Sequence, residues 1–384
     1  MPPAAQSVAW QATGSAATLG AALWVSWRFG LAAQGEFGFA KSWFDAAAVI
    51  ASLGLPQGLL HLQYRCGVAA AALLRWLGRG LVVLAAASMV AAVLLALFGQ
   101  PLPAAVATSL PFAVGHLLAR SLLLAGSGVV VFGIVTALPA LLVLAGVLAF
   151  GAVDRSSGFE VLLLAAAVIG GSVSMLVARR SAGAPTDTPW PHRELWSVSL
   201  QSGLQAALGG ALAAALLSTV AWSGHDKAEL GAASLGWQLY QLFAVGAGYV
   251  APLIFDRLAR EERPSLRRWP APVRGAAVAL LVLAGLALVA GAVWPRWAAV
   301  AVPLAVMLPA GLAGVAARVA GTVLLARAAY VELSLQALAR LVVAVALIAL
   351  ALRWLPAATA LALALLAIEI GTWWRCARVV GKER

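Results

Sequence analysis

The chain is built from a succession of long apolar runs, and this feature limits its fold more than any other. Residues 128–151, for example, contain no charged side chain. A helix needs about 20 mostly apolar residues to cross the hydrocarbon core, and it must pair its backbone polar groups internally. With 63% hydrophobic and 10% charged residues among 384, the chain is far more apolar than a soluble domain. The sequence therefore predicts an all-α polytopic membrane protein.

We predict about twelve transmembrane helices, because the apolar runs break at charged points or at points rich in Pro and Gly. The predicted spans are residues 8–30, 39–61, 80–98, 103–123, 128–151, 160–178, 197–222, 230–254, 272–293, 298–324, 333–353 and 356–374.

A polar stretch rich in Pro, Thr and Ser at residues 179–195 separates six predicted spans from six others. We therefore predict two six-helix bundles, residues 1–185 and 196–384, joined by a cytoplasmic linker at 186–195 and arranged around a central cavity.

The basic residues predict the orientation of these helices. With both termini in the cytoplasm, 18 of the 26 Lys and Arg residues fall on the cytoplasmic side, six fall on the outer side, and Arg318 and Arg340 lie within spans. Lys and Arg favour cytoplasmic loops. The net charge of +12 is thus explained by arginines beside anionic lipid, and no nucleic-acid partner is expected. We place the chain in a bacterial cytoplasmic membrane.

The two halves share short similar stretches at equivalent points. SVAWQ at 7–11 and SVSLQ at 197–201 each open the first span of a half, and QGEFGFA at 34–40 and KAELGAA at 227–233 each open the second. Such a pattern is typical of transporters whose halves are parallel repeats. We therefore predict that Gln11 pairs with Gln201, and Glu36 with Glu229, when the halves are superposed.

Four charged residues gather where the first two predicted spans meet. We expect Arg28 to close the first span at the outer surface and Glu36 to lie in a short outer loop. Lys41 and Asp45 would then begin the second span. Gly35 and Gly38 would allow the tight reversal between the spans, because glycine carries no Cβ.

Pro56 lies inside the second predicted span and is flanked by Gly54 and Gly58. A proline within a membrane helix removes a backbone hydrogen bond and bends the helix. Transporters use broken helices at hinges and along substrate paths. Pro56 is therefore our candidate hinge.

This first hairpin resembles that of the polysaccharide (oligosaccharide) flippases of the multidrug/oligosaccharidyl-lipid/polysaccharide exporter superfamily. The similar elements are Arg28, the step Glu36-Phe37-Gly38, the motif LGLPQ at 53–57 and the basic residue Arg65. The close match covers roughly residues 7–65, and the usual Leu-Gly-Pro after the arginine is replaced here. The resemblance implies a transporter that flips a polyprenyl-pyrophosphate-linked oligosaccharide by alternating access, as in O-antigen and lipopolysaccharide assembly. Membrane lipids and other polysaccharide-assembly proteins would be further partners.

Three charged residues lie inside the last three predicted spans, namely Arg318, Arg340 and Glu369. A charge at the centre of a membrane helix costs about 2.5 to 3.5 kcal/mol on insertion scales, so retained charges usually face a cavity or a partner. In one interpretation the two arginines bind the pyrophosphate of the cargo. In the other, Arg340 and Glu369 form an ion pair and Arg318 extends to the lipid headgroups.

His116 and Arg120 are one helical turn apart in the fourth span and therefore share a face. We consider two roles for them, binding of phosphate or protons and anchoring at the membrane interface. Asp45 is a candidate for binding a coupling cation or proton, as is Glu369. The alternative for Asp45 is an ion pair with Lys41, one turn earlier.

The sequence contains none of the catalytic motifs that we tested for, including HExxH, GxSxG and the phosphate-binding GxxxxGK[ST]. Its two cysteines are too few for a four-cysteine metal site. We expect no enzyme activity, no metal and no cofactor. The alternatives to a flippase are a cation-coupled drug or metabolite exporter of the same superfamily and a membrane-embedded saccharide polymerase or ligase.

Overall fold

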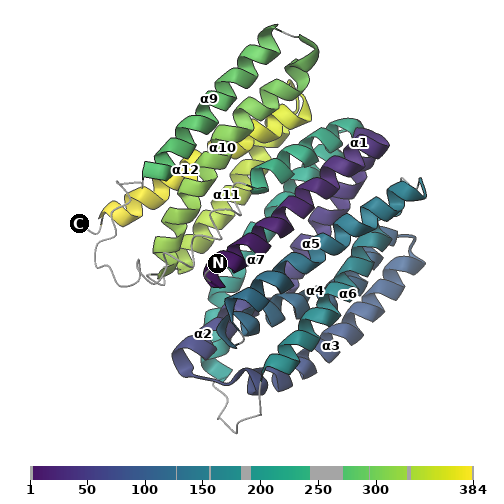
Figure 1. Cartoon of the computed structure of the whole chain (residues 1–384), viewed down its shortest axis with the longest axis vertical. Helices are drawn as coiled ribbons and strands as arrows, with labels where there is room; N and C mark the ends of the chain where they lie inside the picture. Colours follow the sequence, from purple (N-terminus) through teal and green to yellow (C-terminus); the bar gives the residue numbers. More distant parts are fainter. Residues whose placement is uncertain are drawn as a thin grey trace. The chain divides into compact units, whose positions relative to one another are not determined.

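The computed structural model describes residues 3–126, 128–154, 157–182, 192–242, 271–293, 295–326 and 330–382. These residues form helices joined by turns, without a strand among them (Figure 1). Residues 227–242 form a helical segment between α7 and α9. The other helices are α1 (Pro3–Ala51), α2 (Leu55–Cys66), α3 (Ala70–Leu97), α4 (Pro101–Gly126), α5 (Val129–Ala152), α6 (Phe159–Ser181), α7 (His192–Trp222), α9 (Ala271–Val293), α10 (Pro295–Ala326), α11 (Tyr330–Ala351) and α12 (Ala357–Lys382).

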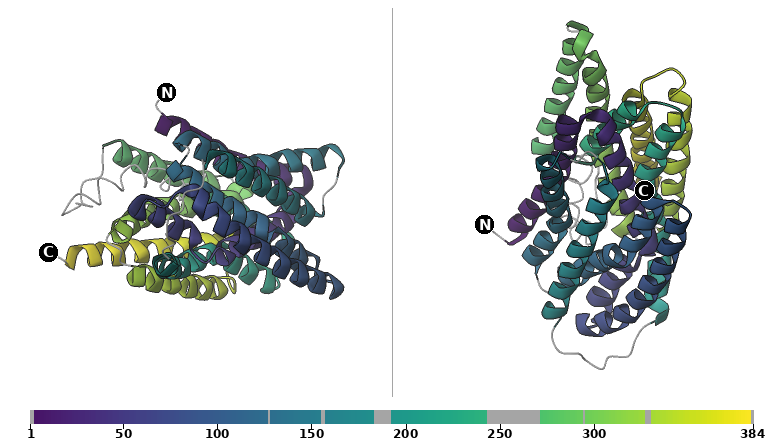
Figure 2. Two further views of the ribbon diagram at one scale, coloured as in Figure 1. Left: turned by 90° about the horizontal axis from the view of Figure 1, so that it is seen from below. Right: turned by 90° about the vertical axis from the view of Figure 1, so that its right-hand side faces the viewer.

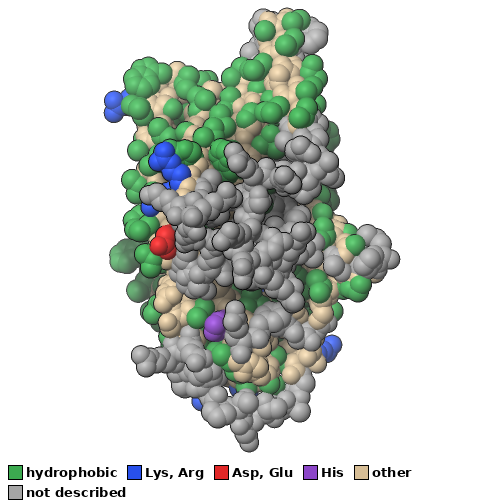
Figure 3. Space-filling view, turned by 90° about the vertical axis from the view of Figure 1, so that its left-hand side faces the viewer, with side chains coloured by type: hydrophobic (Ala, Val, Ile, Leu, Met, Phe, Trp, Pro, Cys, Tyr) green, Lys and Arg blue, Asp and Glu red, His purple; other side chains and the backbone are tan. Residues whose placement is uncertain are grey.

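Within the described residues, eight helices are long and apolar enough to cross a membrane, or nine if α1 and α2 are taken as one bent span. Hydrophobic side chains cover most of the described surface in Figure 3, and charged ones are few. The chain is thus a multi-pass membrane protein, as predicted. Most helices coincide with predicted spans, but α3 begins ten residues before the predicted start at residue 80. Residues 243–254 of the eighth predicted span lie outside the described residues.

The chain divides into two compact units. The first consists of Met1–Phe29 and Glu36–Ala214, and the second of Gly30–Gly35 and Ala215–Arg384. A short segment of α1 therefore belongs with the second unit. Residues 186–191 of the predicted linker lie outside the described residues, and the predicted domain boundaries stay a prediction.

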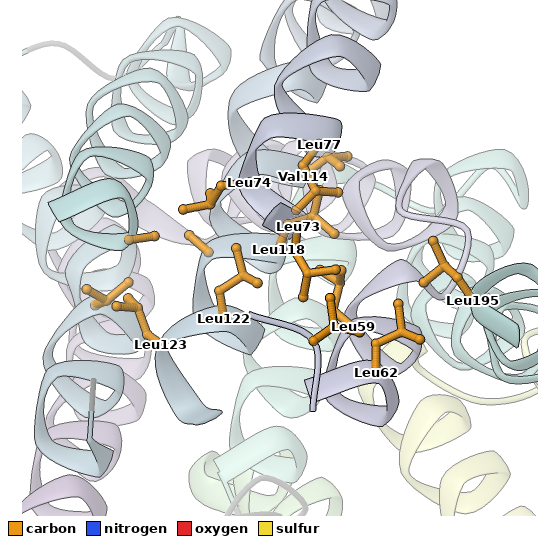
Figure 4. Close-up of a cluster of buried hydrophobic side chains, with 14 residues drawn as sticks. Leu59, Leu62, Leu73, Leu74, Leu77, Val114, Leu118, Leu122, Leu123 and Leu195 are labelled. Carbon is orange, nitrogen blue, oxygen red and sulfur yellow. The ribbon is translucent and has the colours of Figure 1, made fainter. Parts of the chain in front are cut away.

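Leucine packing between α2, α3 and α4 forms an apolar core in the first unit (Figure 4). Helices α3 and α6 both pack on α4, and α5 packs on α6. The buried members of this core are Leu59, Leu62, Val68, Leu73, Leu74, Leu77, Val114, Leu118, Ala119, Leu122, Leu123, Val135, Ala178 and Leu195.

Small residues let α1 approach α5 closely. A Cβ added to Gly133 would lie 2.9 Å from the Ser7 Cα, and one added to Gly14 would lie 3.0 Å from the Ala137 Cα. Helices in a bilayer gain little from the hydrophobic effect, so such close backbone packing stabilises their association. The contact holds the first part of α1 in the first unit.

The predicted outer loop AAQGEFG, residues 32–38, is wrong, because these residues are helical. The interruption lies at Gly30, whose φ of 86° and ψ of 172° are not helical. A positive φ is readily available only to glycine. Gly35 instead provides close packing, since a Cβ added to it would lie 2.5 Å from the Lys227 carbonyl oxygen. Gly35, which we interpreted as part of a chain reversal, therefore marks a close contact between helices.

Pro56 also differs from its predicted setting inside a helix. It lies in the first turn of α2, where a missing backbone N–H breaks no helical hydrogen bond. The break that precedes it is made by Leu53 and Gly54, with φ values of 50° and 71°. The helices on the two sides of the break meet at 49°. The broken helix was predicted correctly, but its cause is a left-handed turn.

The second unit is built around α10, which packs on α9 and α12, and α11 packs on α12 (Figure 2). The segment Gly30–Gly35 contacts the helical segment 227–242. Gln34 Nε2 donates a buried hydrogen bond of 3.1 Å to Ser234 Oγ, and Gly231 lies against the Leu31 carbonyl.

The predicted repeat has a local counterpart in the two halves. Gln11 Nε2 donates to Ser7 Oγ at 3.2 Å, and Gln201 Nε2 donates to Ser197 Oγ at 3.4 Å. The same short motif therefore makes the same contact one helical turn back. The superposition of the halves stays a prediction.

Two glycines of α7 allow the close packing of this fold to be tested. A Cβ on Gly203 would lie 2.7 Å from the Leu53 carbonyl oxygen, whereas one on Gly209 would meet no atom within 4 Å. We expect Gly203→Ala to destabilise the protein by about 1 to 3 kcal/mol, the usual cost of overpacking. Gly209→Ala should be neutral or stabilising by up to about 1 kcal/mol, because alanine favours the helix.

Thermal unfolding in detergent would measure both changes. Equal midpoints for the two variants would contradict the close approach of α7 to the break between α1 and α2.

Candidate functional site

The first unit contains a cavity of about 330 Å³ between α1, α4, α5 and α6. Its polar lining includes Lys41, Asp45, His116, Arg120 and Thr136. Three residues that the sequence singled out separately, Asp45, His116 and Arg120, thus line one cavity. Two basic side chains and a histidine share the cavity with a single carboxylate.

The negative charge of Asp45 is balanced by a lysine one helical turn earlier. Lys41 Nζ lies 2.5 Å from Asp45 Oδ2, and these side chains are 16% and 59% exposed. The alternative role that we considered for Asp45, a pair with Lys41, is therefore present. One positive charge thus balances Asp45, and Arg120 is a further basic side chain in the cavity lining.

His116 is held in a defined tautomer by Ser174 of α6. Ser174 Oγ donates to the Gly170 carbonyl oxygen at 2.5 Å and lies 2.8 Å from His116 Nδ1. A hydroxyl has one proton to donate, so here Ser174 accepts from Nδ1–H. In a neutral imidazole, Nε2 is then the acceptor.

Arg120 and Thr136 complete the polar lining. The Arg120 guanidinium carbon lies 5.5 Å from the centre of the Phe132 ring, a cation–π contact. Thr136 Oγ1 is buried and has no hydrogen-bond partner among the described residues. A buried hydroxyl without a partner is costly, and a polar ligand in the cavity would satisfy it.

The second unit contains a buried cluster of Tyr240, Arg340 and Glu369. Tyr240 OH and Arg340 Nη2 both donate to Glu369 Oε1, and Arg340 Nη2 lies 2.8 Å from Tyr240 OH. Glu369 is 1% exposed and Tyr240 is fully buried. The structure thus contains the ion pair between Arg340 and Glu369 that one interpretation of the sequence predicted.

Gly314 of α10 leaves the space that this cluster occupies. A Cβ added to it would lie 3.2 Å from Tyr240 OH and 3.6 Å from Glu369 Cδ. Arg318 lies one turn further along α10 and is exposed. A second polar contact joins α11 and α12 nearby, where Gln336 Nε2 donates to the Thr372 carbonyl oxygen at 3.0 Å.

Arg28 does not line the cavity of the first unit. Its Nη2 is 2.9 Å from Asp154 Oδ1, in a pair whose side chains are 41% and 76% exposed. Asp154 follows the end of α5 and has a positive φ of 53°. The partner of Arg28 was not predicted, because 126 residues separate the two in the sequence.

Sequence reasoning also missed Tyr240, Ser174 and Thr136. A signal existed for Tyr240, since it is one of only four tyrosines and lies within a predicted span. Ser174 and Thr136 carried no such signal, because hydroxyl side chains in membrane helices commonly bond to their own backbone. Among the described residues, no group of His, Cys, Asp and Glu could hold a metal ion.

Comparison with sequence models of protein families and with curated protein sequences finds no match. Solved structures do match. The chain is similar, over 99% of its length and 95% of theirs, to a crystal structure of MATE in complex with MaD5, at 13% identity and a TM-score of 0.67. It is also similar to a structure of the MATE multidrug transporter DinF-BH, at 12% identity and a TM-score of 0.65, over 100% and 94% of the two chains.

A third structure is a MOP superfamily transporter from Pyrococcus furiosus described as having a binding pocket of reverse polarity, matched at 11% identity and a TM-score of 0.53, over 99% and 95% of the chains. Likeness at such identities shows a common fold. The predicted class, an all-α membrane protein of about twelve helices in two bundles, is thereby confirmed. The chain has the fold of the MATE transporters of the MOP superfamily.

The buried pair in the second unit predicts a non-additive response to mutation. Removing one partner of a buried ion pair leaves a charge without compensation and costs about 3 to 5 kcal/mol. We therefore expect Arg340→Leu and Glu369→Leu each to lower the thermal midpoint strongly, and the double variant to recover most of the loss.

Lys41→Ala is the control, because the partner of Lys41 is largely exposed and such pairs contribute about 1 kcal/mol or less. A double variant no more stable than either single variant would contradict the pairing.

Proposed function

We propose that this chain is a transporter, and not an enzyme, that flips a polyprenyl-pyrophosphate-linked oligosaccharide across the bacterial cytoplasmic membrane for polysaccharide biosynthesis. Transport proceeds by alternating access, and both termini lie in the cytoplasm. Its partners are the lipid-linked cargo, membrane lipids and other polysaccharide-assembly proteins. The fold and the resemblance of the first hairpin to the flippases support this proposal.

The pairing of the intramembrane acids is the observation that carries the proposal. Asp45 is paired with Lys41, and Glu369 with Arg340. Neither carboxylate is therefore left as an uncompensated negative charge for a cationic drug. Arg120 adds a basic group to the cavity of the first unit, and His116 adds a hydrogen-bonding one. This charge balance suits an anionic group such as a diphosphate.

The chemistry of the cargo explains the need for arginine. A hydrophilic glycan cannot cross about 30 Å of hydrocarbon unaided, so the protein must offer it a polar path. Arginine stays protonated and binds phosphate oxygens with two parallel hydrogen bonds. In our proposal Arg120 and Arg318 bind the diphosphate during passage, and Arg28 binds it near the outer surface.

Glu369 and Asp45 are the groups that would couple transport to an ion. Protonation of either carboxylate would release its basic partner, Arg340 or Lys41, to bind the diphosphate. Bending at the break between α1 and α2, beside Pro56, would accompany the change of access. Asp45 is the more accessible of the two carboxylates, since it is 59% exposed and Glu369 is 1% exposed.

The alternative is a cation-coupled exporter of drugs or metabolites. The fold is favourable to it, because one similar structure is that of a multidrug transporter. Such a protein would need Asp45 or Glu369 to exchange its basic partner for the substrate. A saccharide polymerase or ligase would need a large outer loop to build its active site. The connection between α5 and α6 spans only residues 153–158, so this alternative is less well supported.

The ion pair of Arg28 and Asp154 offers a matched test in cells that depend on this chain for surface polysaccharide. If Arg28 binds the cargo, Arg28→Ala should abolish surface polysaccharide and leave lipid-linked oligosaccharide in the cytoplasmic leaflet. Asp154→Asn should retain export, because it keeps the arginine. Arg28→Lys should rescue in part, since lysine binds phosphate as a point charge.

Protein abundance in the membrane is measured for each variant. Equal loss of export in Arg28→Ala and Asp154→Asn, at normal abundance, would mean that Arg28 acts only through its ion pair. Normal export by Arg28→Ala would remove Arg28 from the cargo path.

A further inference from the structure

A groove of about 580 Å³ opens on the first unit between α3, α4 and α6. Its floor is formed by Thr108, Pro111 and Phe112 of α4, because α3 and α6 both pack on that helix. It shares only Gly171 with the cavity that contains Lys41 and Asp45. The groove is therefore separate from the proposed cargo path.

The wall of the groove is mostly apolar, and two of its hydroxyl groups are hydrogen-bonded to the backbone of their own helices. Ser88 Oγ donates to the Leu84 carbonyl oxygen at 2.6 Å, and Thr108 Oγ1 donates to the Ala104 carbonyl oxygen at 2.8 Å. These two hydroxyls thus use their protons within their own helices, and Ser172 is the third hydroxyl of the lining. Hydrocarbon can cover such a wall without leaving these donors unpaired.

The groove faces outward from the helices and has the length of one leaflet. Val82 and Met89 line it and are 69% and 54% exposed. Its lining on α3 runs from Gly78 to Met89, which is about 16 Å at the helical rise per residue. One leaflet contributes about 15 Å of hydrocarbon. The three helices that form the groove are each long and apolar enough to cross a membrane, so lipid would have access to it.

One end of the groove is basic. Arg179 lines this end. Arg180 follows Arg179 in the sequence, and Arg79 follows the lining residue Gly78. The only acidic residue of α3, α4 and α6 is Glu160, in the first turn of α6 and therefore at its opposite end. Arg179 is exposed and makes no ion pair with a described residue. This end lies on the cytoplasmic side in the predicted topology, where anionic lipids attract basic residues.

We infer that the groove binds an anionic glycerophospholipid of the cytoplasmic leaflet, with one acyl chain between α3 and α6 and the phosphate at Arg179. The proposal does not depend on what the transporter carries. Three features of the groove support it: a mostly apolar wall, a length of one leaflet, and, at its basic end, an arginine that makes no ion pair with a described residue.

Two neighbouring glycines of α3 allow a matched test of the acyl-chain site. A Cβ added to Gly78 or to Gly80 meets no atom within 4 Å, so neither substitution should disturb the fold. Only Gly78 lines the groove. We expect Gly78→Leu to fill the groove and to abolish retention of phospholipid, measured by native mass spectrometry of the full chain purified in mild detergent. Gly80→Leu should retain lipid as the unsubstituted chain does.

Arg179 and Arg180 form a second matched pair, because only Arg179 lines the groove. Titration with phosphatidylglycerol should show roughly tenfold weaker binding to Arg179→Gln, as expected for one lost charge-assisted hydrogen bond, and little change for Arg180→Gln. Phosphatidylcholine with the same acyl chains should bind more weakly than phosphatidylglycerol to the unsubstituted chain. Equal retention by Gly78→Leu and Gly80→Leu, equal affinity for both lipids, or a retained polyprenyl lipid in place of phospholipid would overturn the proposal.

Discussion

The need to pair every backbone polar group inside the bilayer governs this structure. It makes most of the described residues helical, and interruptions of a helix need other groups nearby to bond or cover the freed backbone. At the break at Leu53 and Gly54, Gly203 of α7 lies against the Leu53 carbonyl. A Cβ at Gly30 would meet no atom within 4 Å, but the segment that follows Gly30 packs on residues 227–242 through Gly35 and Gly231. Glycine therefore has two roles in α1, because it permits the interruption and it permits the contact that stabilises it.

The same low-dielectric environment explains how the charges are arranged. An isolated charge is expensive in hydrocarbon, so Arg340 and Glu369 are stable as a pair, with Tyr240 donating to the same carboxylate. The pair of Lys41 and Asp45 is less enclosed, because the Asp45 side chain is 59% exposed. Each carboxylate is thus one protonation step away from releasing a basic group. In the proposed mechanism, this is how an ion gradient would change the affinity of the protein for a diphosphate.

Much of the fold could be predicted from sequence, because the length of an apolar run is itself the physical requirement for crossing a bilayer. The pair of Arg340 and Glu369 was predictable as an alternative for the same reason, since a buried charge needs a partner. The loop expected at residues 32–38 was wrong, because Gly35 serves a close contact with residues distant in the sequence. Tyr240 and Asp154, the partner of Arg28, were missed because they also make their contacts with residues distant in the sequence. Contacts between distant helices leave no local pattern, whereas hydrophobic length does.

Movement of the lipid-linked saccharide between leaflets tests the central claim most directly. The purified chain would be reconstituted in vesicles with a fluorescent polyprenyl-pyrophosphate oligosaccharide in both leaflets, and an impermeant quencher would be added outside. Our account predicts that the quencher reaches only the outer-leaflet label in vesicles without protein and the label of both leaflets in vesicles with protein. Protein-containing vesicles that leave the inner-leaflet label protected, while they transport a cationic dye, would contradict the account and support the drug exporter.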